Sequence, residues 1–406
     1  MKQKIDLKTY IRKSRVALLM VALSINVCLN AQNFPKLGSD TLLDIATWNV
    51  EWLGNTTNGP SDEILQYNNV LALMNKTELD IFALQEVSSP STFANLSTAL
   101  GAKYDGFISD FSQTQKTALF WRKSMFEIIP DLSLNIPLNS SDNYAFASRA
   151  PLQVCLRTVG GSKTDTIFLL VIHMKAQTES TDAGRFESYT RRQNAANALK
   201  LYVETTLAGK KFVVLGDWND DLDVSIYNAL PTPYAGLLTA KYTFPSKELT
   251  DAGKSSYAFN TSMIDHIMQS KTLDSFYMKG SAKVFDNASD YVSNFSNNTS
   301  DHFPVYAFYD WKKLSTRIIP ASVTEMHAKA QILIYPNPVQ DKLFIESNEV
   351  LERVVVYQLN GQIAYEQVGE AKVLQMNIGS LPPGFYILQI EGRTALQTSR
   401  LVISSE

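Results

Sequence analysis

Residues 212–220 read FVVLGDWND, and the prediction of the fold starts from this short stretch. The apolar run from Phe212 to Leu215 is typical of a buried strand. Asp217 and Asn219 follow directly, where a loop after the strand would hold them at the edge of a sheet. The stretch therefore predicts a strand that brings a carboxylate and an amide to one rim of a layered fold.

The same arrangement recurs on both sides of this stretch. Apolar and β-branched residues predict strands at 42–50, 80–87, 117–122, 151–158, 166–174, 263–270 and 303–309. Between them, residues 64–76 and 191–207 carry apolar side chains at helical spacing. This mixture predicts an α/β fold in which the chemistry lies where strands end in loops.

Polar side chains stand at the ends of these predicted strands. They are Asn49, Glu51, Glu86, His173, Asp217, Asn219, Asp265, His266, Asp301 and His302. Carboxylates that converge in one cleft repel each other, and a divalent cation relieves that repulsion. Asp, Glu and Asn oxygens suit Mg²⁺, Mn²⁺ or Ca²⁺ better than Zn²⁺, and a phosphate ester is the natural substrate beside such a cation. For any single histidine, a structural role is the alternative.

The motifs, in this order, resemble those of the endonuclease/exonuclease/phosphatase superfamily, to which pancreatic deoxyribonuclease belongs. They are WNVEWLG (48–54), LQEV (84–87), SRAPLQV (148–154), VIHMK (171–175), VLGDWND (214–220), MIDHI (263–267) and SDHFPV (300–305). The resemblance implies a four-layered α/β sandwich with two central β-sheets. We place this catalytic domain at residues 41–311.

The resemblance also implies a metal site. Glu86 matches the metal-binding glutamate of the superfamily, Asn49 its asparagine, and Asp301 the other carboxylate of the metal site. The expected cofactor is Mg²⁺, with Mn²⁺ or Ca²⁺ as alternatives.

Four further residues match the catalytic group of the superfamily. Asp217 and Asn219 match the pair that orients the attacking water and holds the phosphate. His302 matches the essential histidine, and Asp265 matches the carboxylate that orients it. A carboxylate fixes the tautomer of a histidine and makes its ring more basic.

Two residues match groups that contact phosphate, and one of them departs from the pattern. Arg149 matches a phosphate-contacting arginine, and His173 matches the second histidine of the deoxyribonuclease-like and sphingomyelinase-like branches. In pancreatic deoxyribonuclease a glutamate pairs with that histidine, whereas the best local match here is Gln115. Because glutamine cannot stabilise a cationic ring as a carboxylate does, we expect His173 to donate a hydrogen bond to phosphate.

Other residues leave two interpretations open. Arg191 and Arg192, together with Lys116, Lys123 and Lys175, could line a nucleic-acid groove, and a solvated helix face explains the arginines equally well. Trp48, Trp52 and Trp218 are more often packing residues than platforms for bases. Cys155, within PLQVCL, is expected to be a packed thiol of the core.

The N-terminal segment is predicted to be a secretory signal peptide, residues 1–31. Basic residues up to Arg15 precede the apolar run from Val16 to Val27, which is shorter than a membrane-spanning helix. An uncleaved anchor and a lipoprotein modified at Cys28 are the alternatives. The chain has a net charge of −3, and without residues 1–31 it is −8, which argues against coating nucleic acid by bulk charge.

After a connector at 312–331, residues 332–406 read as a separate domain of about seven short strands, a small all-β sandwich. The pieces YPNPVQDKLFI (335–345), VVVYQLNGQ (354–362) and LPPGFYILQI (381–390) resemble the C-terminal sorting domain of type IX secretion. That resemblance implies export through the periplasm and the outer membrane, to the medium or the cell surface. A β-sandwich that binds carbohydrate or protein is the alternative.

Together these features predict a secreted, divalent-metal-dependent phosphodiesterase, most simply an endonuclease acting on extracellular DNA or RNA. A sphingomyelinase-like phospholipid phosphodiesterase or a phosphatase is the alternative enzyme, and a surface adhesin without activity is the alternative from another class. The expected partners are nucleic acid and the type IX secretion machinery. We expect no stable membrane insertion and, by default, a monomer.

Overall fold

The computed structural model describes residues 34–159, 165–239, 242–310, 332–358, 362–392 and 396–404. The chain divides into two compact units, Met1–Ala321 and Ser322–Glu406, and each is treated by itself. The predicted signal peptide, the connector with His327 and the turn at Asn360–Gly361 lie outside the described residues. No helix among the described residues is long and apolar enough to cross a membrane.

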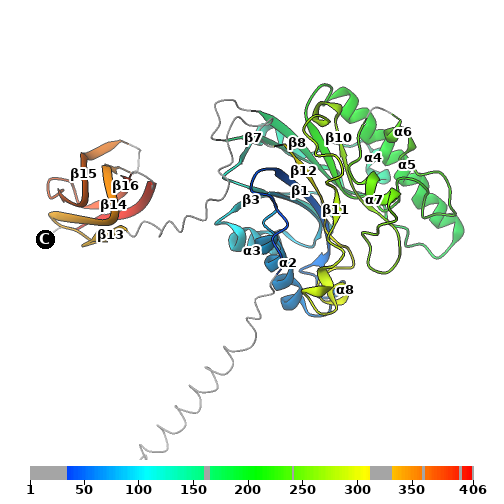
Figure 1. Cartoon of the computed structure of the whole chain (residues 1–406), viewed down its shortest axis with the longest axis horizontal. Coiled ribbons are helices and arrows are strands. Elements are labelled where there is room, and N and C mark those ends of the chain that lie inside the picture. The colour runs from blue at the N-terminus through cyan, green and yellow to red at the C-terminus, as the bar shows by residue number, and fades with distance from the viewer. Residues whose placement is uncertain are drawn as a thin grey trace, which may run out of the picture. The chain divides into compact units, whose positions relative to one another are not determined.

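Two β-sheets form the centre of the first unit (Figure 1), and the described residues give each of them six strands. The first sheet has the order β11 (Lys283–Val284), β12 (Val305–Tyr309), β1 (Leu43–Leu53), β2 (Ile81–Val87), β4 (Lys116–Arg122) and β3 (Tyr104–Ile108). The second has the order β10 (Asp265–Gln269), β9 (Phe212–Asp217), β8 (Thr166–His173), β7 (Leu152–Thr158) and β5 (Phe126–Ile128), with β6 (Leu134–Asn135) also pairing with β7.

Alternating side chains of β1 explain why the sheets stack. Leu43 and Ile45 point into a core shared with strands of the second sheet, whereas Ala46 and Trp48 point into a core shared with helices. Because successive side chains of a strand lie on opposite faces, one apolar strand can bury both faces only between two layers. The predicted strands are present as β1, β2, β4, β7, β8, β9, β10 and β12, and most of their residues are buried.

Helices cover the outer faces. On the first sheet they are α2 (Glu63–Thr77) and α3 (Pro90–Leu100), and on the second α5 (Asp182–Thr205), α4 (Ser140–Ala145) and α6 (Ala235–Leu238) (Figure 1). The shorter helices α7 (Lys247–Asp251) and α8 (Phe295–Asn298) lie in loops. The side chains of Asp62 and Thr181 accept hydrogen bonds from the first turns of α2 and α5, which fixes where these helices begin. The predicted four-layered α/β sandwich is confirmed.

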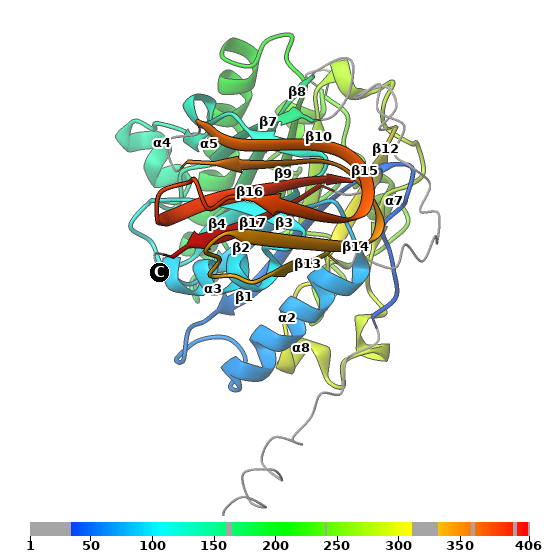
Figure 2. The same ribbon diagram turned by 90° about the vertical axis from the view of Figure 1, so that its left-hand side faces the viewer.

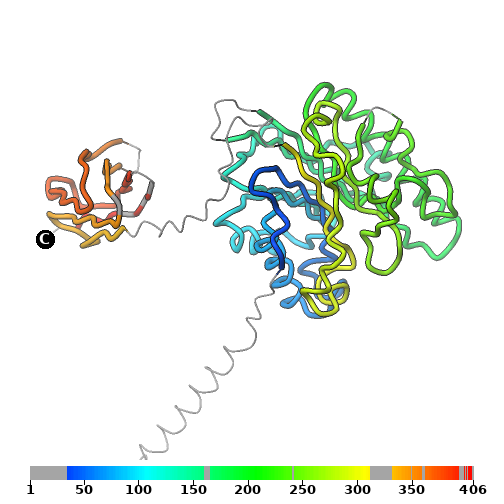
Figure 3. The backbone as a smooth tube through the Cα atoms, viewed as in Figure 1, coloured from blue at the N-terminus to red at the C-terminus, as the bar shows by residue number. Residues whose placement is uncertain are grey.

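Strand direction gathers the polar side chains at one rim. β1 runs parallel to β2 in the first sheet, and β8 runs parallel to β9 in the second. The hydrogen bond from Asn49 to Asp217 shows that both pairs end on the same side. β10 runs antiparallel to β9 and begins where β9 ends, with Asp265 opposite Asp217. The chain returns at β12 to pair with β1 (Figure 3), and residues 301–302 precede that strand at the same rim.

The second unit is all-β, as predicted, but its described residues form five strands rather than about seven. They are β13 (Ile332–Tyr335), β14 (Lys342–Tyr357), β15 (Ile363–Asn377), β16 (Gly384–Gly392) and β17 (Leu396–Ile403), and the longer ones appear as curved ribbons in Figure 2. β14 and β15 are long strands, and each of them spans two of the predicted short strands. Irregular register between Glu346 and Arg353 bends β14, so that its first half pairs with β13 and its second half with β16.

Two buried carboxylates lie at the rim of the first sheet opposite the polar one. The backbone N–H of Asp44 donates to Asp80 over 3.1 Å, and Asp80 also faces the guanidinium of Arg122 at 2.8 Å. Burial, together with the charge of Asp80, raises the pKa of Asp44 to about 9. Asp44 is therefore protonated in the folded chain at neutral pH.

Replacing Asp44 by Asn is expected to raise the melting temperature at pH 8 and to change it little at pH 4. Below pH 4, Asp44 is protonated in both the folded and the unfolded chain. Above pH 4, the unfolded chain releases this proton, whereas the folded chain keeps it until about pH 9. Wild-type stability therefore falls over this range, and an amide avoids the loss. Each 1 kcal/mol corresponds to roughly 2–4 °C for a domain of this size. Glu127→Gln, at a half-exposed carboxylate of β5, is the control and should give no such pH-dependent gain.

Candidate active site

Asn49 and Glu86 meet at the ends of β1 and β2. The Nδ2 of Asn49 donates to Oε1 of Glu86 over 3.2 Å and to Oδ2 of Asp217 over 3.0 Å. The other carboxylate oxygen of Glu86 accepts from the backbone N–H of Trp52 over 3.1 Å. Asn49 thus joins two acidic groups from different sheets through its amide nitrogen, while its oxygen accepts from the N–H of Glu51.

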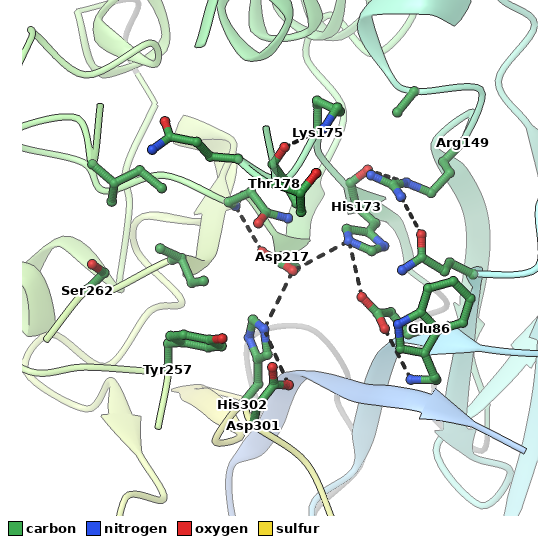
Figure 4. Close-up of a pocket in the computed structure, with 18 of the residues that line it drawn as sticks. Glu86, Arg149, His173, Lys175, Thr178, Asp217, Tyr257, Ser262, Asp301 and His302 are labelled. Carbon is green, nitrogen blue, oxygen red and sulfur yellow. Dashed lines mark hydrogen bonds and ion pairs between the residues drawn. The ribbon is translucent and has the colours of Figure 1, made fainter. Parts of the chain in front are cut away.

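His302 and Asp265 form a close pair. The Nδ1 of His302 lies 2.7 Å from Oδ2 of Asp265, which also accepts from the hydroxyl of Ser256 over 2.7 Å. Burial by itself would lower the pKa of His302, but the charges of Asp265, Asp217 and Asp301 outweigh it and hold the pKa well above its usual value. His302 is therefore an imidazolium whose Nε2 faces the carboxylates of Asp217 and Asp301, each at 3.9 Å (Figure 4).

Asp217 lies between the two histidines. Its Oδ2 is 3.5 Å from Nε2 of His173, and its Oδ1 accepts from the backbone N–H of Asn219 over 2.9 Å. Burial raises the pKa of Asp217 to about 7, although the charge of His302 works against this. A carboxylate with that pKa can take up a proton near neutrality. The side chain of Asn219 donates to the carbonyl oxygen of Met174 over 3.2 Å.

His173 is uncharged in this setting. Burial, with the positive charges of Arg149 and His302, holds the pKa of His173 well below its usual value. Its Nε2 faces Asp217 and, at 3.7 Å, Oε1 of Glu86, while its Nδ1 has no hydrogen-bond partner among the described residues. A neutral ring of this kind can donate one hydrogen bond, and it is a poor source of a proton.

Gln115 does not pair with His173, contrary to the expected correspondence. Its Oε1 accepts from Nη1 of Arg149 over 2.7 Å. Arg149 also donates to the backbone carbonyls of His173 and Met174, over 3.2 and 2.6 Å. The physical reason is that a buried guanidinium has five N–H donors to satisfy, and a neutral amide oxygen satisfies one of them without cancelling its charge. Burial lowers the pKa of Arg149 to about 10, so it is still charged at pH 7.

The corner around Glu86 fits a hard divalent cation. Burial raises the pKa of Glu86 above its usual value, and burial with the charges of Asp301 and Glu86 raises the pKa of Glu51 to about 7. The carboxylate of Glu51 accepts from the N–H of Asp301 over 2.9 Å. The carboxylates of Glu51, Glu86 and Asp301 lie near enough to affect one another's charge. They offer the oxygen ligands that Mg²⁺, Mn²⁺ and Ca²⁺ prefer, and a cation would relieve their repulsion.

Another group, Asp217, Asp265 and His302, also has potential ligand atoms within 4.8 Å of one another. Nδ1 of His302 is engaged by Asp265, so the ring offers a cation only its Nε2 atom. The group is thus a second set of candidate metal ligands beside the corner around Glu86.

Backbone conformation singles out the same rim. Glu51, Trp52, Glu86 and Asn219 all have positive φ, at 43°, 54°, 64° and 56°. Such conformations are uncommon for residues other than glycine and cost about 1–3 kcal/mol each, so they persist where surrounding contacts impose them. Here the hydrogen bonds of Asn49, Glu86 and Asp217 hold them in place.

Most of the candidate site residues line a cleft of about 870 Å³. Figure 4 shows Glu86, His173, Asp217, Asp301 and His302 on its floor. Arg149, Lys175 and Arg191 line it on the side of the second sheet, and Trp52, Tyr257 and Asn260 also contribute to its walls. All but two of the predicted site residues border this cleft directly; Asn49 and Asp265 lie behind Glu86 and His302.

Other candidates have structural roles. His266 is fully buried and bonds Ser246 and the backbone of Asp220, at 3.1 Å each. Arg192 is buried in an ion pair with Asp220 at 2.8 Å, whereas Arg191 lines the cleft and lies over the ring of Tyr144. Arg191 thus agrees with the nucleic-acid groove, whereas Arg192 agrees with neither interpretation, because it is buried and not on a solvated helix face.

Several aromatic and apolar candidates pack as predicted. Trp48, Trp218 and Cys155 are fully buried in the hydrophobic cores, whereas Trp52 lines the cleft. Sequence reasoning missed Tyr257, whose ring lies 5.1 Å from that of His302. The signal that could have found it is its place in an aromatic pair, Tyr257 and Phe259, shortly before MIDHI.

Comparison with known proteins agrees with this geometry. Residues 46–302 match the sequence model of the Endonuclease/Exonuclease/phosphatase family, so the chain belongs to that family, whose members are phosphodiesterase and nuclease hydrolases. Residues 333–404 match the Secretion system C-terminal sorting domain. No curated protein matches the chain.

Similar solved structures share the fold. A humanized D. rerio TDP2 is 15% identical, with a TM-score of 0.47, and the match covers 67% of this chain and 99% of that one. The human Nocturnin catalytic domain is 18% identical, with a TM-score of 0.43 and coverages of 66% and 94%. An endonuclease/exonuclease/phosphatase from Bacteroides vulgatus is 18% identical, with a TM-score of 0.46 and coverages of 66% and 98%.

Proposed function

We propose that the chain is a secreted, divalent-cation-dependent phosphodiesterase that hydrolyses nucleic acid outside the cell. The observation that carries this proposal is the charged His302–Asp265 pair facing Asp217 on the floor of a cleft that Arg149 also lines. Imidazolium and guanidinium groups that border one cleft suit an anionic phosphate.

In the proposed mechanism, Asp217 accepts a proton from the water that attacks phosphorus, a role that its pKa of about 7 supports. The P–O bond to the leaving group breaks, and the leaving oxygen takes up a proton from solvent water. His302 and Arg149 donate hydrogen bonds to the phosphoryl oxygens, where negative charge develops. Neutral His173 and the amide of Asn219 add hydrogen bonds without adding negative charge. Glu86, Asp301 and Glu51 would hold Mg²⁺, which supplies charge neutralisation at the phosphate when bound. Asn49, predicted as part of the metal site, joins Glu86 to Asp217 through its amide nitrogen and would orient both carboxylates.

The experiment is a comparison of substrates with the purified protein. Plasmid DNA, RNA, sphingomyelin and inositol phosphates are incubated with Mg²⁺, with Ca²⁺ or with a chelator. We expect cleavage of nucleic acid in the presence of a cation. Hydrolysis of sphingomyelin alone would replace the nuclease by a phospholipid phosphodiesterase. That second candidate has one observation in its favour, since apolar Ile226 lines the cleft and is 36% exposed.

Gln115 provides a test of the phosphate role of Arg149. Gln115→Ala is expected to raise KM about fivefold to tenfold, with little change in kcat, because the guanidinium loses one of the contacts that orient it. Gln115→Glu should raise KM further, since a carboxylate would compete with phosphate for Arg149. Steady-state kinetics on a short phosphodiester decides the matter. An unchanged KM in both variants would contradict the role.

Deletion of residues 332–406 tests the export that the sorting domain implies. None of the proposed site residues lies there, so the shortened chain should keep its activity in a cell extract. In the native host it should accumulate in the periplasm instead of the medium or the cell surface. Activity measured in the three fractions decides this, and unchanged export would favour the alternative of a binding module.

A further inference from the structure

A short segment before β10 lies directly against the catalytic histidine. Tyr257 forms an antiparallel bridge with His302, and the backbone N–H of Ala258 donates to the carbonyl of Asp301 over 2.7 Å. The ring centroids of Tyr257 and His302 are 5.1 Å apart, at 65°. The segment is therefore fixed to the loop that carries His302 and Asp301.

Phe259 lies at the exposed end of this segment. Its ring is 5.8 Å from that of Tyr257, at 76°, and its side chain is 60% exposed. The loop around it is ordered, because the hydroxyl of Ser255 lies 2.9 Å from the carbonyl oxygens of both Asn260 and Ser262. Phe259 thus lies on an ordered loop, between Tyr257 and Asn260, which both line the cleft.

Polarity distinguishes this side of the cleft from the opposite one. Arg149, Lys175 and Arg191 give the far wall positive charge, suited to the phosphates of a strand. On the near side, the rings of Tyr257 and Phe259 give an apolar face on which a flat aromatic ring can pack.

We propose that Tyr257 and Phe259 form an aromatic shelf that stacks one base of a nucleic-acid strand next to the scissile phosphate. This inference rests on the proposed nuclease function and names the group that the enzyme holds beside His302. Bases of any sequence have a flat π face, so stacking on Phe259 tolerates any base. Asn260 and Ser262, which line the cleft beside the shelf, can meet the polar edge of that base.

The test uses short single-stranded oligonucleotides in which one linkage is cleavable and the others are methylphosphonates. One version is intact, and two others carry a base-free sugar on the 5′ or the 3′ side of the cleavable phosphate. Phe259→Ala is expected to lower kcat/KM about tenfold on the intact strand. On the version that lacks the stacked base, the wild type should already be slow, and Phe259→Ala should cost less than twofold more.

Controls separate stacking from a general loss of structure. Phe259→Tyr keeps the ring and should retain wild-type kcat/KM. Ile64→Ala, at an apolar side chain on α2 that is 75% exposed, is the matched control and should change nothing. Equal loss for Phe259→Ala on all three oligonucleotides, or no loss at all, overturns the shelf. The nuclease function is judged separately, by whether the wild type cleaves the intact strand.

A binding measurement tests the shelf without turnover. In the His302→Ala background, an oligonucleotide that carries 2-aminopurine next to the cleavable phosphate should lose fluorescence on binding, because stacking quenches it. Adding Phe259→Ala should restore most of the fluorescence of the bound strand. Undiminished quenching in the double variant contradicts the proposal.

Discussion

His302→Ala is expected to lower kcat by about 10²–10⁴-fold, with a melting temperature close to that of the wild type. The imidazolium of His302 faces both Asp217 and Asp301. Without it, the phosphoryl oxygens lose a charged hydrogen-bond donor. The fold should survive, because Trp48 is anchored on the backbone carbonyl of His302, at 2.9 Å, and not on its ring. Steady-state kinetics and thermal unfolding of the same preparation measure both effects. Full activity in this variant would remove His302 from the mechanism.

Asp265→Asn provides the graded comparison. An amide oxygen can still accept from Nδ1 of His302, so the ring stays oriented, but the negative charge that raises its pKa is lost. The loss of kcat should be smaller, about tenfold, and the alkaline limb of the pH profile should move to lower pH as His302 deprotonates earlier. A limb that stays in place would contradict this reading of His302. His266→Ala is the contrast, because that buried histidine should affect stability first.

The second large effect concerns the cation. Treatment with a chelator is expected to abolish activity, and Glu86→Gln should lower it by about a hundredfold at low Mg²⁺. The variant loses one negative charge at a corner where burial and neighbouring acids already raise carboxyl pKa values. Excess Mg²⁺ should restore part of the activity, so that the Mg²⁺ concentration for half-maximal rate moves upward.

Glu127→Gln is the matched control for this experiment. Glu127 lies on β5, is half exposed and pairs with Arg157 away from the cleft. Its Mg²⁺ dependence should equal that of the wild type. An unchanged Mg²⁺ dependence in Glu86→Gln, or full activity with chelator, would contradict a metal role for this corner.

Much of this arrangement follows from local sequence. A buried apolar strand ends abruptly at a polar residue in 212–220, in 81–87 and in 166–173, and these signals are short enough to be read without tertiary information. Parallel pairing places the end of β1 beside Glu86 and the end of β8 beside Asp217, and the stacking of the two sheets brings the two pairs to one rim. The layered fold and the set of rim residues were therefore predictable.

Contacts between residues far apart in the chain could not be predicted from the sequence. Gln115 lies 34 residues before Arg149, and nothing in either neighbourhood indicates that the amide satisfies the guanidinium instead of His173. Arg191 and Arg192 are adjacent in sequence, yet a rotation of one residue on α5 buries Arg192 against Asp220 and leaves Arg191 at the cleft. Such outcomes depend on how two packed layers meet.

The lengths of the strands in the sorting domain could not be predicted from local sequence patterns either. Polar residues between Glu346 and Arg353 read as a break between two strands, because bulged residues and turn residues have similar composition. The backbone passes through this region as one irregular strand, since β15 and β16 supply partners on both sides.

The pairing of β12 with β1 has a consequence for when the enzyme becomes active. One edge of β1 pairs with β12, residues 305–309. His302 lies just before β12, so it takes its place only when that strand has been made. Under the proposed mechanism, a chain that ends before this strand lacks His302 and should be inactive. Because contacts between residues so distant in sequence form slowly, the proposed nuclease should also stay inactive for an interval after its synthesis.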